Sequence, residues 1–431
     1  MVTLSRKFES AIKAICLLAF IFISSSAIAD SVVISGGPTN DYESWIARLS
    51  DDRIMVAFAR NPDWASGDLY VAFSADNGLN WTSPEPIISG SGDQATLSFV
   101  QMPSDTLKLF YASDQNGSYK IRSAWSVDGL TWTDEGVVAL GWGTSVQYYD
   151  PTLVVESDSS LAMNYVVMSQ GVYVAHRPYG GQWDTEMTQV ASTGYRPRLM
   201  KHTNGTYLYA YHARTGGQYE YDVFITTSSD RLNWSTPVQI TTNRNSHDPF
   251  VCRMYDGHYM VTYAKHAGGA YNLYCRFSLD AIDWGEEFVI TEDNANNTQP
   301  HIWPEGNDLY LTYAHAVNYP DDHDVYLEVL AYLTGIADNP NLAENYDLDL
   351  GCYPNPFNAA TTISYTLTEE SLVSLEVYDI LGRKIANLIN CNQPAGEQTV
   401  VWNATDQPSG MYFARLRVGL HYEHVKMILL K

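Results

Sequence analysis

Tryptophan recurs at a nearly constant interval through the first two thirds of this chain. Successive copies lie about 51 residues apart in a sequence of 431 residues. Because tryptophan is a rare residue, four nearly equal intervals indicate an internal repeat, in which each copy forms one unit that packs on the next. The five positions are Trp81, Trp132, Trp183, Trp234 and Trp284.

Four of these tryptophans end a short motif that begins with serine and has aspartate two residues later. The first copy reads Ser74-Ala-Asp-Asn-Gly-Leu-Asn-Trp81, whereas the third keeps only Trp183 with Gly180 and Gly181. An aspartate in such a turn accepts backbone N–H bonds, and Gly or Asn tolerates a left-handed backbone. The motif resembles the Asp box, or BNR repeat, of sialidase-like β-propellers. We therefore expect a structural role for Asp76, Trp81, Asp128, Trp132, Asp230, Trp234, Asp280 and Trp284.

Each repeat also predicts four short strands, because runs of Val, Ile, Thr and Tyr alternate with Gly-rich and Ser-Asp turns. The last unit, from about Gln299 to Leu333, has only three, and Ser31–Ser35 resembles the missing outer strand. Pairing the two would close a ring of sheets and remove exposed edges. We predict an all-β fold, a six-bladed β-propeller followed by a C-terminal β-sandwich. The six first strands are marked by Ala47, Ala95, Pro151, Pro197, Pro249 and Pro300.

The first 29 residues have the pattern of a secretory signal peptide. Arg6 and Lys7 form a basic region, Ala14–Ile23 an apolar core, and Ala27-Ile28-Ala29 a small-residue cleavage site. The apolar core is too short to span a membrane as a stable anchor, and we predict no transmembrane segment in the mature chain. The net charge of −24 makes nucleic acid an unfavourable partner.

The composition changes again near residue 336, where Asn, Asp, Pro and Ala replace the strand pattern. Beyond this stretch come Tyr353-Pro-Asn-Pro-Phe-Asn358, Val373–Arg383 and the terminal Lys426–Lys431. This segment resembles the C-terminal sorting domain of type IX secretion cargo, a small β-sandwich. The resemblance implies export through the periplasm by the type IX secretion machinery to the medium or the outer cell surface. The predicted domains are 1–29 (signal peptide), 30–335 (propeller), 336–350 (linker) and 351–431 (sorting domain).

Four cysteines remain outside the signal peptide. Cys252 and Cys275 fall on strands separated by a third, about 9–10 Å apart, which exceeds the reach of a disulfide. We expect them to be free thiols, whereas the sequence leaves the pairing of Cys352 with Cys391 open.

In a propeller, ligands bind at the face where the first strands begin and the second strands end. Carboxylates, an arginine, histidines and aromatic rings that converge there suit a sugar, because rings stack on it and polar groups bind its hydroxyls. The residues before the strand-start Pro or Ala are Ile46, Gln94, Asp150, Arg196, Asp248 and Gln299. Arg196 is expected near Asp150 or Asp248, because buried carboxylates need a partner. The candidate ligand contacts are Trp45, Tyr195, Arg196, His247, Gln299, His212, His266 and His315, and the candidate acid and base residues are Asp63, Asp150 and Asp248.

Active sialidases carry an Arg-Ile-Pro motif in the first blade. Here Trp45 occupies the arginine position and Ala47 the proline position, so a true sialidase is not expected. We predict a secreted or cell-surface propeller that binds an extracellular polysaccharide or glycoconjugate. A second hypothesis is an exo-glycosidase that uses the aspartates to hydrolyse such a ligand, and a third is a structural or adhesive surface protein. No cofactor or metal site is predicted, and the sequence leaves a need for Ca²⁺ open.

The sorting-domain resemblance predicts that residues 351–431 are needed for export and not for folding of the remainder. Deletion of these residues should trap a folded protein in the periplasm of the native host, as measured by cell fractionation and protease resistance. Truncated protein that reached the medium at the normal level would contradict the assignment.

Overall fold

The computed structural model describes residues 20–24 and 31–431, apart from 63–65, 142, 144, 185–186, 203–204, 255–256, 307, 319–320, 335–347, 349, 368–370, 380–383, 406 and 419–420. Within these residues the secondary structure is entirely β-strand. The chain divides into two compact units, with the division after Gly335. The predicted linker lies largely outside the described residues, as does the predicted signal peptide except for Phe20–Ser24.

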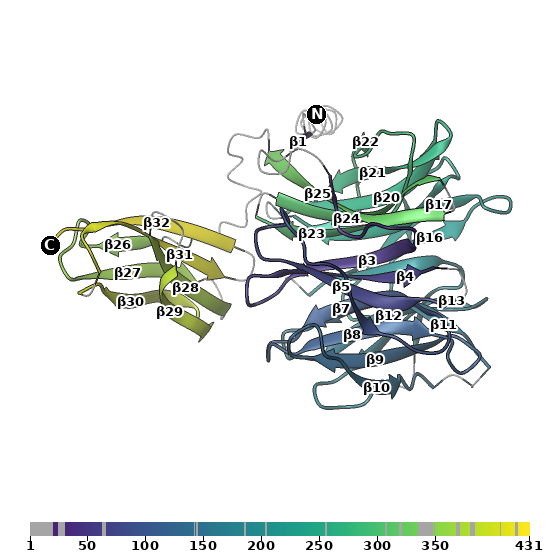
Figure 1. Cartoon of the computed structure of the whole chain (residues 1–431), viewed down its shortest axis with the longest axis horizontal. Coiled ribbons are helices and arrows are strands. Elements are labelled where there is room, and N and C mark those ends of the chain that lie inside the picture. Colours follow the sequence, from purple (N-terminus) through teal and green to yellow (C-terminus); the bar gives the residue numbers. More distant parts are fainter. Residues whose placement is uncertain are drawn as a thin grey trace, which may run out of the picture. The chain divides into compact units, whose positions relative to one another are not determined.

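The first unit consists of six antiparallel sheets formed in chain order (Figure 1). In each of the first five, four consecutive strands pair with their neighbours in sequence, as the repeat predicts. The strands of the first three sheets are β3 (Asn40–Arg48), β4 (Ile54–Asn61), β5 (Asp68–Ser74) and β6 (Glu85–Ile88); β7 (Gln94–Gln101), β8 (Leu107–Ser113), β9 (Lys120–Ser126) and β10 (Thr133–Val137); and β11 (Tyr148–Val155), β12 (Leu161–Val167), β13 (Gly171–Arg177) and β14 (Thr188–Ala191).

The remaining three sheets continue the pattern, and their first strands pack in a cycle with those before them. Each of the strands β3, β7, β11, β15, β19 and β23 contacts the next, and β23 of the last sheet contacts β3 of the first. The strands of these sheets are β15 (Tyr195–Lys201), β16 (Tyr207–Arg214), β17 (Tyr221–Ser228) and β18 (Val238–Gln239); β19 (Ser246–Arg253), β20 (Tyr259–Ala267), β21 (Ala270–Ser278) and β22 (Phe288–Val289); and β23 (Asn296–Glu305), β24 (Asp308–Asn318) and β25 (Asp321–Thr334).

The outer edge of the last sheet is covered by the N-terminal part of the chain. In β2 (Val32–Val33), Val32 pairs with Leu327 and Val33 with Tyr326, and the Ile34 N–H donates to the Val325 carbonyl at 2.8 Å. The prediction that Ser31–Ser35 completes this sheet is therefore confirmed. Further along the same edge, β1 (Phe20–Ser24) pairs with Leu330–Thr334, so both segments cover an edge that would otherwise be open.

The first strand of every sheet contains a bulge at the same position. One residue in each bulge has a left-handed backbone, with φ between 41° and 56°. The strand register shifts at each of these points, as expected when an extra residue is inserted. The six residues, called the bulge cluster below, are Glu43, Thr96, Asp150, Arg196, Asp248 and Gln299.

The bulges correct the sequence alignment of the first two sheets. Glu43 and Thr96, and not Ile46 and Gln94, are equivalent to Asp150. In the last four sheets the next residue is proline, whereas in the first two it is Ser44 or Leu97. Because these two sheets lack the proline, alignment by sequence shifts the landmark to Ala47 and Ala95.

The turns that precede the repeated tryptophans, predicted to be Asp boxes, bind their own backbone. In the second turn, the Asp128 carboxylate accepts the N–H groups of Leu130 and Thr131, each at 2.8 Å. The indole N–H of Trp132 donates to the Gly129 carbonyl at 3.0 Å. Later copies have Arg231 and Ala281 in the glycine position, and both keep a left-handed backbone, with φ of 67° and 59°. The hydrogen bonds of the turn therefore hold this conformation even after the glycine is lost.

The second unit has two sheets that share one hydrophobic core. Phe357, Trp402 and Tyr412 pack together near its centre, with ring centroids 5.1–5.5 Å apart. Cys352 and Cys391 are free, as are the buried Cys252 and Cys275 of the first unit. The sheets contain β26 (Gly351–Tyr353), β27 (Ala360–Leu367) and β30 (Gly396–Asn403), and β28 (Ser371–Asp379), β29 (Lys384–Gln393), β31 (Gly410–Val418) and β32 (His421–Leu429).

A cluster of charges lies where the last sheet meets the first. The fully buried Asp41 accepts two hydrogen bonds from Arg60, at 2.6 and 2.7 Å. Near them Asp324 of β25 has a buried carboxylate oxygen without a hydrogen-bond partner among the described residues. Burial and the charge of Asp41 raise the pKa of Asp324 to about 6.

This pKa predicts that Asp324→Asn stabilises the protein above about pH 6. In the wild type, the folded state must carry an unfavourable charge there, and stability is lost as the pH rises from about 4 to about 6. Asp324 is only partly buried, so solvent screening reduces the expected gain in unfolding free energy to about 1 kcal/mol. Denaturant unfolding at pH 4 and pH 7.5 tests this. An equal effect at both pH values would contradict the shifted pKa.

Candidate functional site

The bulge cluster forms one connected polar network, although its six residues come from six different sheets. Thr96 Oγ1 accepts the Asp150 N–H at 3.1 Å, and Asp150 Oδ2 accepts the Arg196 N–H at 3.2 Å. On the other side, Gln299 Oε1 accepts the Glu43 N–H at 2.9 Å. The repeated bulge thus brings residues that are far apart in sequence to one place.

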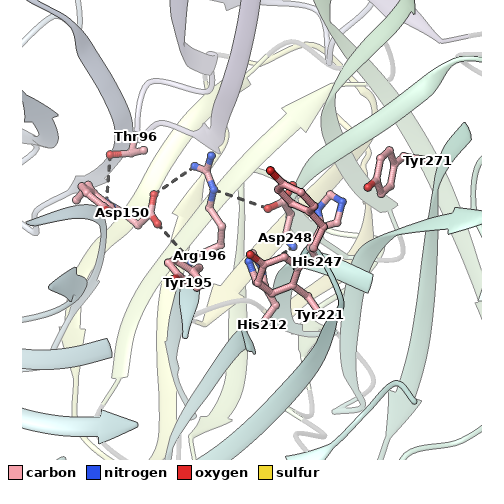
Figure 2. A pocket seen from close by; sticks show the side chains of 11 residues that line it. Thr96, Asp150, Tyr195, Arg196, His212, Tyr221, His247, Asp248 and Tyr271 are labelled. Carbon is pink, nitrogen blue, oxygen red and sulfur yellow. Dashed lines mark hydrogen bonds and ion pairs between the residues drawn. The ribbon is translucent and has the colours of Figure 1, made fainter. Parts of the chain in front are cut away.

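Arg196 is the hub of this network. Its Nη1 donates to Glu43, and it lies 3.2 Å from Asp150 Oδ1; its Nε lies 3.7 Å from Asp248 Oδ1. Figure 2 shows the guanidinium between Asp150 and Asp248. The carboxylate side chains are 5–11% exposed, so they are shielded from water and strongly coupled to the guanidinium. Arg196 lies beside both aspartates, as the burial argument predicts.

Two carboxyl groups of the hub differ in their affinity for a proton. Burial raises the pKa of Glu43, and the neighbouring Asp150 adds to the rise, against the opposing charge of Arg196. Burial alone would also raise the pKa of Asp248, but the charges of His247 and Arg196 hold it well below its ordinary value. His247 Nδ1 lies 3.0 Å from Asp248 Oδ2. The site therefore combines a carboxyl group with a raised pKa, that of Glu43, with one whose pKa is lowered, that of Asp248.

His212 holds the backbone of this site. Its Nδ1 accepts the N–H of Asp248 at 3.0 Å. Burial lowers the pKa of His212 to about 3, so the ring is neutral at neutral pH and carries its proton on Nε2. The ring also contacts Tyr221 and Tyr195, with centroids 5.1 and 5.8 Å apart.

A pocket of about 450 Å³ lies over the hub, within the range typical of small-molecule sites. Its walls are mainly tyrosine and histidine, and Figure 2 shows these rings around Asp248. Tyr271 packs against His247, with ring centroids 4.6 Å apart. The lining residues are Thr96, Tyr149, Asp150, Tyr195, Arg196, His212, Tyr219, Tyr221, His247, Asp248 and Tyr271.

Six of the residues predicted from sequence line this pocket, whereas Gln299 lies outside the lining and accepts the N–H of Glu43. Trp45 does not line it: its ring packs between sheets against His301, with centroids 4.1 Å apart, and against Phe250. The bulge at Glu43 displaces Trp45 from the position that sequence counting assigns to it.

Two predicted histidines also lie away from the lining. His266 is exposed and touches the edge of Tyr271, with centroids 4.9 Å apart. His315 Nδ1 is 2.8 Å from Asn297 Oδ1. Asp63 lies outside the described residues. Searched over the described chain, the structure contains no group of three His, Cys, Asp or Glu side chains suited to a metal ion.

Sequence reasoning missed several residues of the site. Thr96 was hidden by the displaced alignment of the second sheet, and in the first sheet that displacement assigned the bulge position of Glu43 to Ile46. Tyr221 is the first residue of β17 and Tyr271 the second residue of β21, so they lie near the start of the third strands of adjacent sheets, one repeat period apart. That shared position is a signal that could have identified them.

Comparisons with known proteins agree with the two-unit architecture. Residues 351–431 match the family model described as a secretion system C-terminal sorting domain. The curated proteins contain no significant match to the sequence.

Among solved structures, an α-L-arabinofuranosidase from Fusarium graminearum with an iminosugar inhibitor has 16% identity and a TM-score of 0.55, covering 72% of this chain and 98% of its own. The NanB sialidase from Streptococcus pneumoniae has 11% identity and a TM-score of 0.54, covering 72% and 70%. A protein of unknown function from Dyadobacter fermentans has 13% identity and a TM-score of 0.60, covering 72% and 99%. At these identities, the likeness shows the fold alone.

The chain is thus an exported protein with a fold shared by propeller-like glycosidases. More particularly, the first unit shares its fold with solved glycosidases, and residues 351–431 form a type IX secretion sorting domain, which places the protein in the medium or on the cell surface. No helix in the described part of the chain is long and apolar enough to cross a membrane.

The hub predicts that Arg196→Met destabilises the protein at neutral pH by about 3 kcal/mol, because three buried carboxylates lose their partner. The loss should shrink as the pH falls below about 4, because the wild type then loses the stability that comes from the lowered pKa of Asp248. Arg214→Met is the matched control, since Arg214 is exposed on the following strand. Denaturant unfolding measures both variants. Equal stabilities for the two would contradict the hub.

Proposed function

We propose that the first unit is a six-bladed β-propeller spanning residues 30–335 and that residues 351–431 form a β-sandwich. The cyclic contacts between the first strands of the six sheets support the ring. The core shared by the two sheets of the second unit supports the sandwich. The Asp-box resemblance, the signal peptide and the linker at 336–350 belong to the same proposal.

We propose that the pocket binds an extracellular glycan. The observation that carries this proposal is the position of Arg196, which holds two carboxylates at the floor of an aromatic pocket. Sugar hydroxyls need fixed donors and acceptors, and the faces of sugar rings pack on flat aromatic surfaces. The hypothesis of a structural or adhesive protein is disfavoured, because the described lining residues surround an open pocket that apolar side chains do not fill.

The charge of the site favours an uncharged sugar. Among the described lining residues, Arg196 is the only guanidinium, and it is already engaged by three carboxylates. A sugar carboxylate would therefore find no unengaged guanidinium among the described lining residues. The first sheet also carries no Arg-Ile-Pro motif, which is the feature by which the sialidase resemblance would bind an acidic substrate. A neutral glycan, of the kind cleaved by an arabinofuranosidase, fits this electrostatic pattern better than sialic acid.

Hydrolysis is a second candidate function, favoured by the opposite pKa shifts of Glu43 and Asp248. Two carboxyl groups whose surroundings separate their pKa values are the usual acid and base of a glycosidase. In this candidate function, Glu43 donates a proton to the leaving oxygen, while ionised Asp248 or Asp150 activates water or stabilises the developing positive charge.

Binding predicts that Asp150→Asn and Asp248→Asn each weaken glycan affinity at least about tenfold. Arg196 retains two carboxylate partners in each variant, so melting temperatures should fall by only a few degrees. Asp134→Asn is the matched control, because Asp134 pairs with Arg122 away from the pocket. A glycan array with the purified protein, followed by calorimetry on the hits, tests this. Unchanged affinity in both pocket variants would overturn the proposal.

Hydrolysis predicts a different result for Glu43→Gln. The amide cannot supply a proton, so kcat should fall at least about a hundredfold while the oligosaccharide still binds. Turnover is measured by release of reducing ends from the glycans that bind. Wild-type protein that binds a glycan tightly without releasing product would leave binding as the function and exclude hydrolysis of that glycan.

A further inference from the structure

One tyrosine at the pocket differs from the others in its exposure. Tyr219 lines the pocket, yet its side chain lies in the loop between β16 and β17 and the residue is 74% exposed. Tyr195 is 38% exposed, and Tyr221 and Tyr271 are partly buried. Tyr219 is therefore the outermost aromatic ring of the wall, and most of its surface remains available for contact.

The backbone at Tyr219 is also unusual, with φ of 71°. A non-glycine residue in the left-handed region costs free energy and persists only where the surrounding structure holds it. Glycine adopts this conformation without a steric cost, and the loop contains Gly216 and Gly217. The left-handed residue is nevertheless Tyr219, which has a large aromatic side chain. Burial of the ring does not compensate for the cost, because the ring faces solvent.

The loop is held in place by its own hydrogen bonds. The Glu220 carboxylate accepts the Gly217 N–H at 2.7 Å and lies 3.5 Å from Arg244. The Thr215 N–H donates to the Glu220 carbonyl at 3.1 Å, and Thr215 Oγ1 donates to the buried Asp222 at 2.6 Å. These bonds fix the residues on both sides of Tyr219 and therefore present its ring at the mouth of the pocket.

We infer that Tyr219 forms a second sugar-binding position, one sugar unit outside the position over Arg196. The inference rests on the glycan-binding function proposed above and extends it to the length of the ligand. A single sugar at the floor of the pocket leaves the ring of Tyr219 in water. A ligand of two or more units places its second ring against Tyr219, where apolar contact replaces exposed surface. The ligand is thus a neutral oligosaccharide or the end of a polysaccharide.

The test uses the full-length protein and linear neutral oligosaccharides of one to four units from the arabinose, xylose and glucose series. Affinities are measured by calorimetry for the wild type, Tyr219→Ala, Tyr219→Phe and Tyr179→Ala. Tyr179 is the matched control, since it is 76% exposed in a loop and does not line the pocket. All three changes are at exposed positions, so folding is expected to be retained and is checked by the melting temperature.

The wild type should bind the two-unit ligand about tenfold more tightly than the single sugar. Tyr219→Ala should remove most of that gain, so that the variant binds the two-unit ligand no more than about twofold more tightly than it binds the single sugar. Tyr219→Phe should keep the gain, because the contact is made by the ring, and Tyr179→Ala should match the wild type.

Equal binding of the two-unit ligand by Tyr219→Ala and the wild type would overturn the second position and leave the glycan-binding pocket intact. The same would follow if the single sugar and the longer ligands bound the wild type equally. A wild type that bound no oligosaccharide of any series, together with an empty glycan array, would overturn the proposed function and this inference with it.

Discussion

The left-handed bulge in each first strand is the constraint on which the candidate site depends. In a regular strand, successive side chains alternate between the two faces and would pack between neighbouring sheets. An extra residue with positive φ interrupts this alternation and redirects one side chain per sheet. None of the six residues is glycine, so each carries a conformational cost of about 1–2 kcal/mol. The hydrogen bonds and ion pairs among Glu43, Asp150, Arg196 and their neighbours offset part of that cost.

Arg196 contributes both to the stability of the first unit and to the proposed ligand-binding site. The Arg196 guanidinium faces three acidic side chains, and the charge of the neighbouring Arg198 acts on the same three. Burial raises the pKa of Glu43, whereas the charges of His247 and Arg196 lower that of Asp248. Buried, closely spaced carboxyl groups cost folding free energy in the absence of ligand, and a glycosidase requires such groups at its site. A pocket with such internal pairing is suited to hydroxyl groups and unsuited to a second anion.

Much of this structure was accessible from the sequence because a repeat makes equivalent positions comparable. The tryptophan period predicts the sheets, and Val32–Val33 pairs at the predicted edge. In the last four sheets, proline marks the bulge, so the sequence alone places Asp150, Arg196, Asp248 and Gln299 at their correct positions. The first two sheets lack that proline, so counting along the sequence assigns Trp45 to the ligand-binding face, whereas its ring packs between sheets.

Other features of the site could not be read from local sequence. The raised pKa of Glu43 depends on Arg196 and Asp150, which come from two other sheets and meet Glu43 only in the folded chain. The neutral state of His212 follows from its burial, since nothing in its neighbouring residues distinguishes it from the exposed His266. Burial and long-range pairing are properties of the assembled ring and not of any one strand.

The most direct measurement of the central claim is a crystal structure of the protein with the tightest-binding oligosaccharide from the glycan screen. We predict a sugar over Arg196, with its hydroxyls bonded to Asp150 or Asp248 and its ring beside Tyr195 or Tyr221. An oligosaccharide bound elsewhere on the first unit, with this pocket empty in the same crystal, would contradict the claim.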